Sequence, residues 1–343
     1  MLTSAILLTL LWPVLLGSLL LYRPTLRLAR RLLPLALVPA LLLALLPLAG
    51  GRVELPGVLL DSALLLDGDR QHLLLLLGLL LSLAAATAPV SYETHGRRRA
   101  FELLLLLFIG ALLLLVLAAD AVLLFSAGTL AGYALYGMLV CHPDAAGHPG
   151  TRVLVVMLVL ADLVIFELLL MLAQLDVGMG FGALREAWPE ESSRGTLLSL
   201  MLLGFGVKAG MVGVHYWLAP VWLHAGSALH LLLIAFVFSA GLLPWWLLLP
   251  ADGINWPAAA GVLSPLALVL GLYAAVAGVL QSRRAVAPAY LIMVLGALWL
   301  AVVALLLGQP ALMARLGPLL PLLWAQSALA LALFVLLPGA FGI

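Results

Sequence analysis

Long uncharged apolar runs, such as Leu103–Ala119, recur along the whole chain. Each is close to the roughly 20 residues that a helix needs to cross a bilayer. In hydrocarbon every backbone polar group must be satisfied internally, so a chain of this kind forms either helices or a closed barrel. Barrel strands alternate apolar and polar residues, whereas Leu73–Leu83 is apolar on nearly every face. The sequence therefore predicts an all-α integral membrane protein and excludes a soluble domain.

The amino-acid composition excludes several classes of function. Hydrophobic residues make up 66% of the chain and charged residues 9%, against roughly 25% charged in soluble domains. The formal net charge of +1 argues against a nucleic-acid partner. A single cysteine, Cys141, excludes an intrachain disulfide and an iron–sulfur cluster held by this chain's cysteines alone. The sequence shows no nucleotide-binding loop and no nucleophile arrangement, so we expect no cofactor and no catalysis by this chain itself.

We expect about eleven transmembrane helices in a single transmembrane domain, residues 1–343. The first apolar run has no basic segment before it, so we interpret it as a span and not as a cleavable signal. The polar stretch Gly50–Arg70 is rich in turn residues and predicts a small β-hairpin outside the bilayer. The expected spans are Thr3–Leu21, Leu33–Ala49, Leu73–Ser91, Phe101–Ala119, Val122–Cys141, Val153–Ala173, Leu197–Trp217, Leu223–Leu249, Ala258–Leu280, Val286–Leu307 and Leu316–Leu337.

Arginine clusters predict the orientation, because cytoplasmic loops carry an excess of basic residues. Arginines follow the first, third, fifth and ninth predicted spans, which suits eleven spans with the N-terminus outside and the C-terminus in the cytoplasm. We therefore expect a multi-pass protein of the inner (cytoplasmic) membrane. The arginines concerned are Arg23, Arg27, Arg30, Arg31, Arg97, Arg98, Arg99, Arg152, Arg283 and Arg284.

The only lysine of the chain, Lys208, lies in the middle of the predicted seventh span. An ionisable group at that depth costs roughly 2.5–3.5 kcal/mol on insertion scales and usually marks a pathway or a partner. Lysine also suits proton transfer, because burial brings its pKa towards neutrality whereas arginine stays charged. A structural ion pair between helices is the alternative interpretation.

Glycines surround Lys208, and their spacing leaves two interpretations open. Either they allow neighbouring helices to approach closely, or they mark a broken helix that lines a wet cavity. The glycines are Gly204, Gly206, Gly210 and Gly213.

Two histidines and two carboxylates are further candidates. In a continuous helix His215 would share a face with Lys208, roughly 10 Å away along the axis. His230 falls within the eighth span, and each histidine is either a proton relay or a hydrogen-bonded packing residue. Asp162 and Glu167 lie on the sixth span about 140° apart, so only one of them is expected to face Lys208.

The segment Leu203–Pro220, LGFGVKAGMVGVHYWLAP, resembles the central signature of the antiporter-like proton-translocating subunits of respiratory complex I. That family includes the large subunits of Mrp-type antiporters and of complex I-related membrane hydrogenases. The buried lysine, the Lys-Ala-Gly run and the His-x-Trp-Leu end all match. Similar stretches begin at Leu117, Leu158, Ser239 and Gln281 in the same order, so the resemblance covers most of the chain to about Tyr290.

The departures from the family pattern concern the proton path. The glutamate usual in the fifth helix is replaced by Thr129, and the lysine that some members carry in the eighth helix is replaced by Ser239. Family members usually have about fourteen helices in two inverted five-helix repeats. The resemblance therefore implies an antiporter-like bundle with a broken seventh helix, N-terminal helices in 1–91 with an insert at 50–70, a first repeat in 101–250 and an incomplete second repeat in 257–343.

The resemblance implies proton translocation, or cation/proton antiport, in a complex with other membrane subunits. Lys208 would hold the proton, His215 would relay it, and Asp162 or Glu167 would replace the lost glutamate. His230 and Thr129 complete the expected relay. Two alternatives remain, a structural subunit that has lost transport and an anchoring subunit that holds a soluble partner through the Arg97–Arg99 loop.

Overall fold

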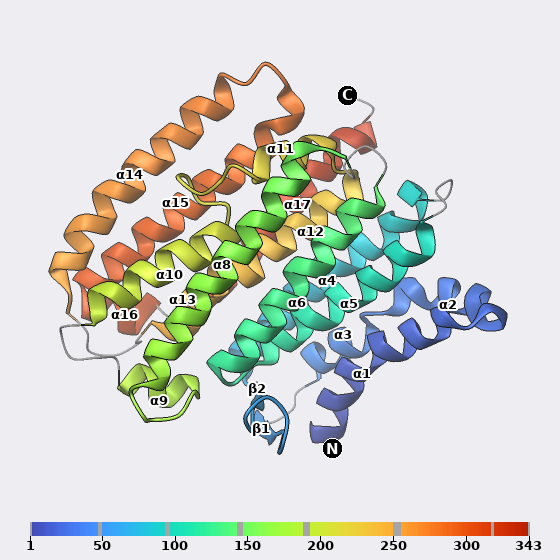
Figure 1. Cartoon of the computed structure of the whole chain (residues 1–343), viewed down its shortest axis with the longest axis horizontal. Coiled ribbons are helices and arrows are strands. Elements are labelled where there is room, and N and C mark those ends of the chain that lie inside the picture. The colour runs from blue at the N-terminus through green and yellow to red at the C-terminus, as the bar shows by residue number, and fades with distance from the viewer. Residues whose placement is uncertain are drawn as a thin grey trace.

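The computed structural model describes residues 2–46, 50–92, 97–142, 147–187, 193–249, 255–316 and 319–341. The chain is an all-α, multi-pass membrane protein whose helices run side by side in one bundle (Figure 1). In this part of the chain, nine helical stretches are long and apolar enough to cross a membrane, against the expected eleven. They are α1 (Leu2–Leu21), the stretch Arg23–Leu45, α4 (Gly68–Tyr92), α5 (Arg98–Leu117), α6 (Ala121–Cys141), α8 (Pro149–Ala173), the stretch Ser227–Leu248, α14 (Pro257–Val279) and the stretch Arg284–Gly308 with α15 (Ala287–Gly308).

The expected seventh and eleventh spans account for the difference. The expected seventh span, Leu197–Trp217, is not one helix, because α10 (Arg194–Lys208) ends after 15 residues and the next helix, α11, is Leu218–His224. Gly210 and Gly213 have φ angles of +62° and +98°, a left-handed backbone that cannot continue the helix. At the C-terminal end, α17 (Leu320–Phe341) contains a shorter apolar stretch, Leu322–Leu336.

Three of the spans are built from more than one helical piece, and one of them joins the short helix η4 (Arg284–Val286) to α15. The second span consists of η1 (Arg23–Thr25), α2 (Leu26–Leu32), η2 (Leu33–Leu35) and α3 (Val38–Leu45). Three of these pieces carry a proline at their first or second position, where the missing N–H is harmless. The end of the expected span Leu33–Ala49, residues 47–49, lies outside the described residues. The stretch Ser227–Leu248 combines α12 (Ser227–Phe236), the π-helical segment η3 (Val237–Leu242) and α13 (Leu243–Leu248).

The predicted β-hairpin is confirmed. Strands β1 (Gly51–Glu54) and β2 (Ala63–Leu66) pair antiparallel, with Gly51 opposite Leu66. Asp120, the N-cap of α6, holds the hairpin against the bundle. Its carboxylate accepts hydrogen bonds from the Ala63 amide at 3.0 Å and from the Ser62 hydroxyl at 3.1 Å. A short helix, α9 (Phe181–Glu186), and the helix α16 (Pro310–Leu316) complete the described elements.

The arginines of the predicted loops also contribute to packing between the N-terminal helices and α5. Arg30 and Arg98 both donate to the carboxylate of Glu102, at 3.0 and 2.8 Å. Arg99 donates to the last carbonyl groups of α1, where the helix dipole favours a cation. Arg97 donates to the Val140 carbonyl at 3.0 Å. Each member of the Arg97–Arg99 loop therefore has a partner within this chain, which weakens the case for a loop dedicated to an external partner.

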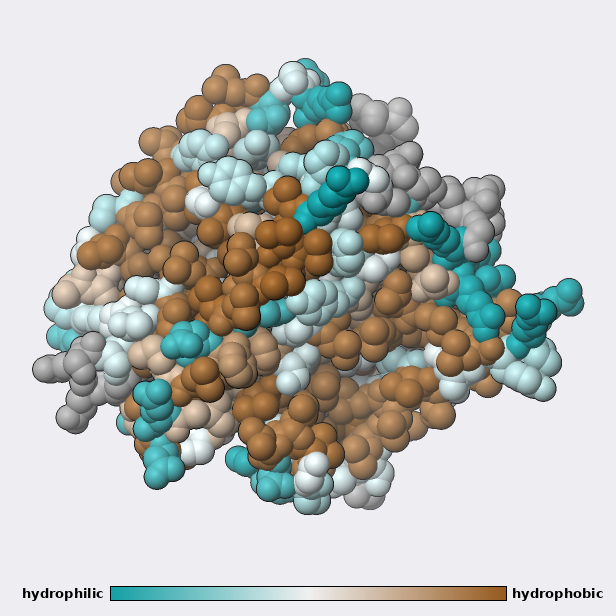
Figure 2. All heavy atoms as spheres, in the orientation of Figure 1, coloured by the Kyte–Doolittle hydropathy of each residue, from teal (hydrophilic) through white to brown (hydrophobic). Residues whose placement is uncertain are grey.

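Hydrophobic side chains cover much of the flanks of the bundle (Figure 2). On α14 the outward side chains of Leu268, Val269 and Leu272 are 62–72% exposed. An apolar patch of this extent marks a membrane or partner contact. Hydrophilic side chains gather instead at the ends of the helices, as they do where α2 and the start of α5 lie (Figure 2).

Candidate functional site

Lys208 is the last residue of α10, and its side chain is only 2% exposed. Its ammonium nitrogen, Nζ, lies 2.7 Å from Oδ1 of Asp162 on the neighbouring helix α8. The Asp162 side chain is 12% exposed. Besides this ion pair, the negative end of the α10 dipole favours a cation at this position. The structure thus brings together the two charges that the sequence placed deep in separate spans.

Helix α6 provides the wall behind the lysine. A Cβ atom on Gly128 would lie 3.7 Å from Lys208 Nζ, so any larger side chain there would crowd the ammonium group. Three residues earlier, the Phe125 ring lies 6.0 Å from Nζ, within the range of a cation–π contact. Gly128 therefore leaves room for the ammonium group of Lys208, and the Phe125 ring partly compensates for the water that this group loses on burial.

Asp162 has further hydrogen-bonding partners on α6. The Thr129 hydroxyl donates to Oδ1 of Asp162 at 3.0 Å. The Tyr133 hydroxyl, one helical turn beyond Thr129, interacts with the same carboxylate. Since the Tyr133 side chain is 38% exposed, polar groups connect the surface of the chain to the buried ion pair. Sequence reasoning did not identify Tyr133, although a phenol four residues after Thr129 shares its helical face.

Glu167 lies apart from this cluster. It is exposed on the outer face of α8, whereas Asp162 faces α10 and α6. The helical spacing correctly predicted that only one of the two carboxylates would meet the lysine. The structure selects Asp162, which accepts from Thr129 and pairs with Lys208 at the same time.

His215 does not lie on a helix with Lys208, so the expected two-turn spacing was wrong. The residue belongs to the turn segment 209–217, between the end of α10 and the start of α11. Its Nδ1 accepts from the Gly213 amide at 3.2 Å, and its ring stacks on Tyr216. The Tyr273 ring of α14 meets it edge-on, with 5.9 Å between the ring centroids.

His230 on α12 is held by a different set of contacts. Its Nε2 lies 2.8 Å from the Trp222 carbonyl oxygen, and its ring stacks on the Trp222 indole at 4.3 Å. This is the arrangement of a hydrogen-bonded packing histidine. Among the residues that the structure describes, no hydrogen bond joins His215 or His230 to Lys208.

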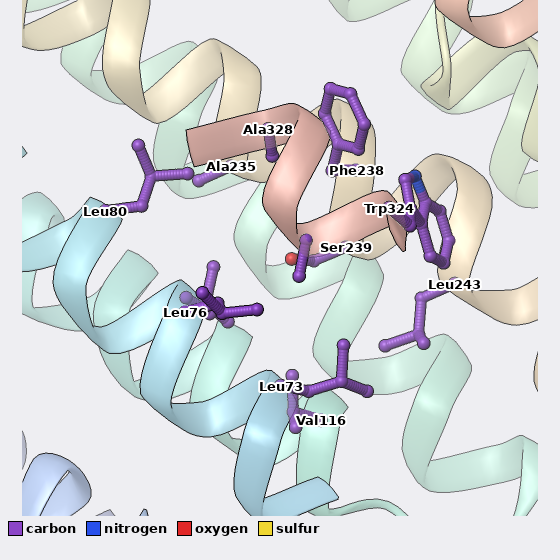
Figure 3. Close-up of a pocket in the computed structure, with 12 residues that line it drawn as sticks. Leu73, Leu76, Leu80, Val116, Ala235, Phe238, Ser239, Leu243, Trp324 and Ala328 are labelled. Carbon is purple, nitrogen blue, oxygen red and sulfur yellow. The ribbon is translucent and has the colours of Figure 1, made fainter. Parts of the chain in front are cut away.

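Ser239 belongs to the π-helical segment η3 and faces a small pocket between α4 and α17 (Figure 3). The cavity has a volume of about 30 Å³, and its walls are mainly leucine, alanine and aromatic side chains such as Leu76 and Phe238. That volume is enough for about one or two water molecules. Ser239 itself is 6% exposed. This part of the bundle therefore offers little room for a hydrated polar path.

Segment η3 also fixes the end of α10. A Cβ atom on Gly241 would lie 2.5 Å from the backbone N and Cα atoms of Ala209. Only a glycine allows the two backbones to come this close. The residue that follows Lys208 is thereby held against the eighth predicted span.

Comparisons with known proteins identify the fold. No family model matches the chain, and no curated protein matches it. The chain is similar to a chain in the structure of the membrane-bound sulfane sulfur reductase, an archaeal respiratory membrane complex. The TM-score is 0.72 at 15% sequence identity, and the match covers 88% of this chain and 64% of that chain. The chain thus spans less than two thirds of the protein that it matches, and at this identity the likeness establishes a shared fold.

Proposed function

We propose that this chain is a proton-translocating membrane subunit of a multi-subunit respiratory complex, with Lys208 as the group that holds and releases the proton. The observation that carries the proposal is the buried ion pair between Lys208 and Asp162, 2.7 Å apart and joined to the surface through Tyr133. An intramembrane charge is by default a functional site. The fold shared with a respiratory membrane complex supports the same assignment.

The chemistry follows from the two states of the pair. A lysine beside a carboxylate keeps its proton, whereas a lysine left unpaired in an apolar site releases it. Thr129 and Tyr133 are alternative donors to Asp162, so its carboxylate keeps hydrogen bonds when it moves away from the ammonium group. A small displacement of Asp162 therefore switches the proton affinity of Lys208. The driving reaction belongs to partner subunits.

The geometry of α10 and α11 supports one interrupted span. Helix α10 ends at Lys208 and α11 begins at Leu218, and the turn segment between them contains His215. Backbone groups freed at such a break are tolerated in a membrane where they line a water-filled cavity. In this proposal water carries the proton between Lys208 and His215. The proposal also places the N-terminal end of α1 outside and the end of α17 in the cytoplasm, and it assigns 257–343 to a second repeat.

The test uses the assembled complex in sealed vesicles. Lys208→Ala is expected to abolish proton uptake that is coupled to turnover, while co-purification shows that the complex still assembles. Glu167→Gln, on an exposed face of α8, is the control and should retain uptake. Unchanged uptake by an assembled Lys208→Ala complex would overturn the proposal.

A structural subunit without transport is the second candidate. It is favoured by the pocket at Ser239, which is mainly apolar and too small for a continuous water path. Under this alternative the ion pair only fixes α8 against α10. Lys208→Met would then leave proton uptake by the assembled complex unchanged.

A further inference from the structure

An apolar groove of about 420 Å³ runs between α1 and α5. Pro13 and Gly17 line it from α1, and Leu107 and Gly110 line it from α5. The hydroxyl of Ser18, a polar lining residue, is already bonded to the Leu15 carbonyl at 2.7 Å. The groove therefore offers a hydrocarbon-like surface of the size of small-molecule sites.

Two glycines keep the groove open. A Cβ atom on Gly17 would meet no other atom within 4 Å, and one on Gly110 would come no closer than 3.9 Å to Pro13. Their missing side chains thus leave space that the rest of the chain does not fill. Neither glycine has the left-handed backbone that would require this residue type.

Arginine side chains lie at one end of the groove. Leu21 lines the groove, and the Arg99 guanidinium donates to the carbonyl oxygen of Leu21. Because its acceptors are uncharged carbonyls, Arg99 keeps its full positive charge. Arg23, two residues beyond Leu21, is exposed. Hydrophilic side chains gather at this end of the molecule, where α2 and the start of α5 lie (Figure 2).

A second feature of this end adds to the charge. Arg30 and Arg98 share the single carboxylate of Glu102, so this triad is net positive. Basic pockets between transmembrane helices bind anionic lipid head groups, and each arginine near the surface contributes about 1 kcal/mol. An apolar groove that leads to such a basic site suits the two parts of an anionic phospholipid, the hydrocarbon tail and the negative phosphate.

We propose that the groove between α1 and α5 binds one acyl chain of an anionic phospholipid, with its phosphate against Arg99 and Arg23. The arginines at the groove end complement the negative phosphate of such a lipid. A helix of a neighbouring subunit would need an acidic side chain beside the same arginines. The site is independent of Lys208, which lies at the end of α10 against α6 and α8.

The test compares lipids and groove variants. The full-length protein, purified in a neutral detergent with whatever subunits accompany it, is incubated with dioleoyl phosphatidylglycerol or dioleoyl phosphatidylcholine and examined by native mass spectrometry. We expect tight retention of phosphatidylglycerol and at least tenfold weaker retention of phosphatidylcholine. Gly17→Phe should weaken phosphatidylglycerol retention at least tenfold, because the phenyl ring fills the groove. Gly110→Leu should act in the same direction from the opposite wall.

Two further variants separate the groove from general effects. Gly261→Phe adds the same ring to an exposed position of α14 with nothing within 4 Å, and it should bind lipid like the wild type. Arg23→Gln should weaken phosphatidylglycerol retention about fivefold, the loss of one arginine near a lipid phosphate. In native membranes, a photo-reactive leucine analogue in place of Leu107, which lines the groove and has about the same size as the natural side chain, should cross-link to phospholipid.

Three results would overturn the proposal. Equal retention of the two lipids would show that the site does not select an anionic head group. Wild-type retention by both Gly17→Phe and Gly110→Leu would place the bound lipid elsewhere. Cross-linking from position 107 to another polypeptide would show that a neighbouring subunit fills the groove.

Discussion

Lys208 Nζ and Asp162 Oδ1 are 2.7 Å apart between two different helices, with side chains 2% and 12% exposed. A buried ion pair adds little stability compared with well-packed apolar residues, because both charges lose their water. This chain nevertheless places its single lysine there. The proposed titrating role would account for that placement, since lysine is the basic side chain whose proton affinity responds most readily to burial and to a neighbouring carboxylate.

Asp162→Asn should lower proton uptake by the assembled complex at least tenfold. The substitution leaves the buried ammonium group without its counter-charge, and breaking such a pair costs about 3–5 kcal/mol. Glu167→Gln is the matched control on the same helix, about 140° away around its axis. Its uptake should stay within twofold of the wild type. Equal losses in the two variants would show that charge on α8, and not the pair with Lys208, governs the activity.

Thr129→Val should slow proton uptake about tenfold while the complex remains assembled. Valine keeps the shape of threonine but removes the hydroxyl that donates to Asp162 at 3.0 Å. A hydrogen bond to a charged group contributes about 1.5–3 kcal/mol. Thr129→Ser keeps the hydroxyl and should retain most of the rate. If valine and serine behave alike, the hydroxyl has no part in controlling the carboxylate.

Residue patterns predicted the membrane fold and the depth of the charges, but not how they meet. Apolar runs located the nine spanning stretches because burial in lipid constrains every residue of a span. The choice between Asp162 and Glu167 depends on how α8 is rotated against α10, which is a tertiary property. The sequence pattern did not identify Tyr133, because its phenol interacts with a carboxylate on another helix and such a contact depends on tertiary structure.

The sequence around Lys208 was harder to interpret because its glycines fit two structures. Glycine spacing is compatible with close helix packing and with a chain break, and both occur here. Gly204 allows α8 to pack closely, because a Cβ atom there would lie 2.5 Å from the Ile165 side chain. Gly210 and Gly213 adopt left-handed backbone that ends α10. The predicted spacing of His215 from Lys208 assumed a continuous helix, so it was wrong for the same reason.

Gly241→Ala should destabilise the protein by about 1–3 kcal/mol, the usual cost of overpacking a well-packed contact. The added methyl group would lie 2.5 Å from the Ala209 backbone, which cannot move aside as a flexible side chain would. Thermal unfolding in detergent measures the effect as a lower midpoint. Gly261→Ala, whose added methyl group meets nothing within 4 Å, should leave the midpoint unchanged or slightly higher. Matching midpoints for the two variants would contradict the close contact.

Acid should loosen the beginning of α8 through His148. Its Nδ1 accepts from the Gly150 amide at 3.0 Å, which requires a neutral ring, and its ring stacks on His224. Burial, together with the charge of His224, lowers the pKa of His148 from its ordinary 6.5. A lowered pKa in the folded state means that the cap is complete above about pH 6.5 and is lost as the pH falls through the lower folded value.

Hydrogen exchange of the segment 149–158 at pH 7.5 and pH 5.5 checks this expectation after correction for intrinsic rates. Protection should fall several-fold at the lower pH in the wild type. His148→Asn provides an amide oxygen that caps at both pH values, so its protection should not change. The same pH dependence in the asparagine variant would assign the effect to another group.

Lys208→Arg tests the central claim most directly, because arginine keeps the positive charge and the ion pair with Asp162 but does not release its proton. Turnover-coupled proton uptake is measured in vesicles, with co-purification and the thermal midpoint of the variant as checks on assembly. The account predicts an assembled complex whose proton uptake is lost. Uptake at the wild-type rate by the arginine variant would show that the charge at position 208 only holds α8 against α10.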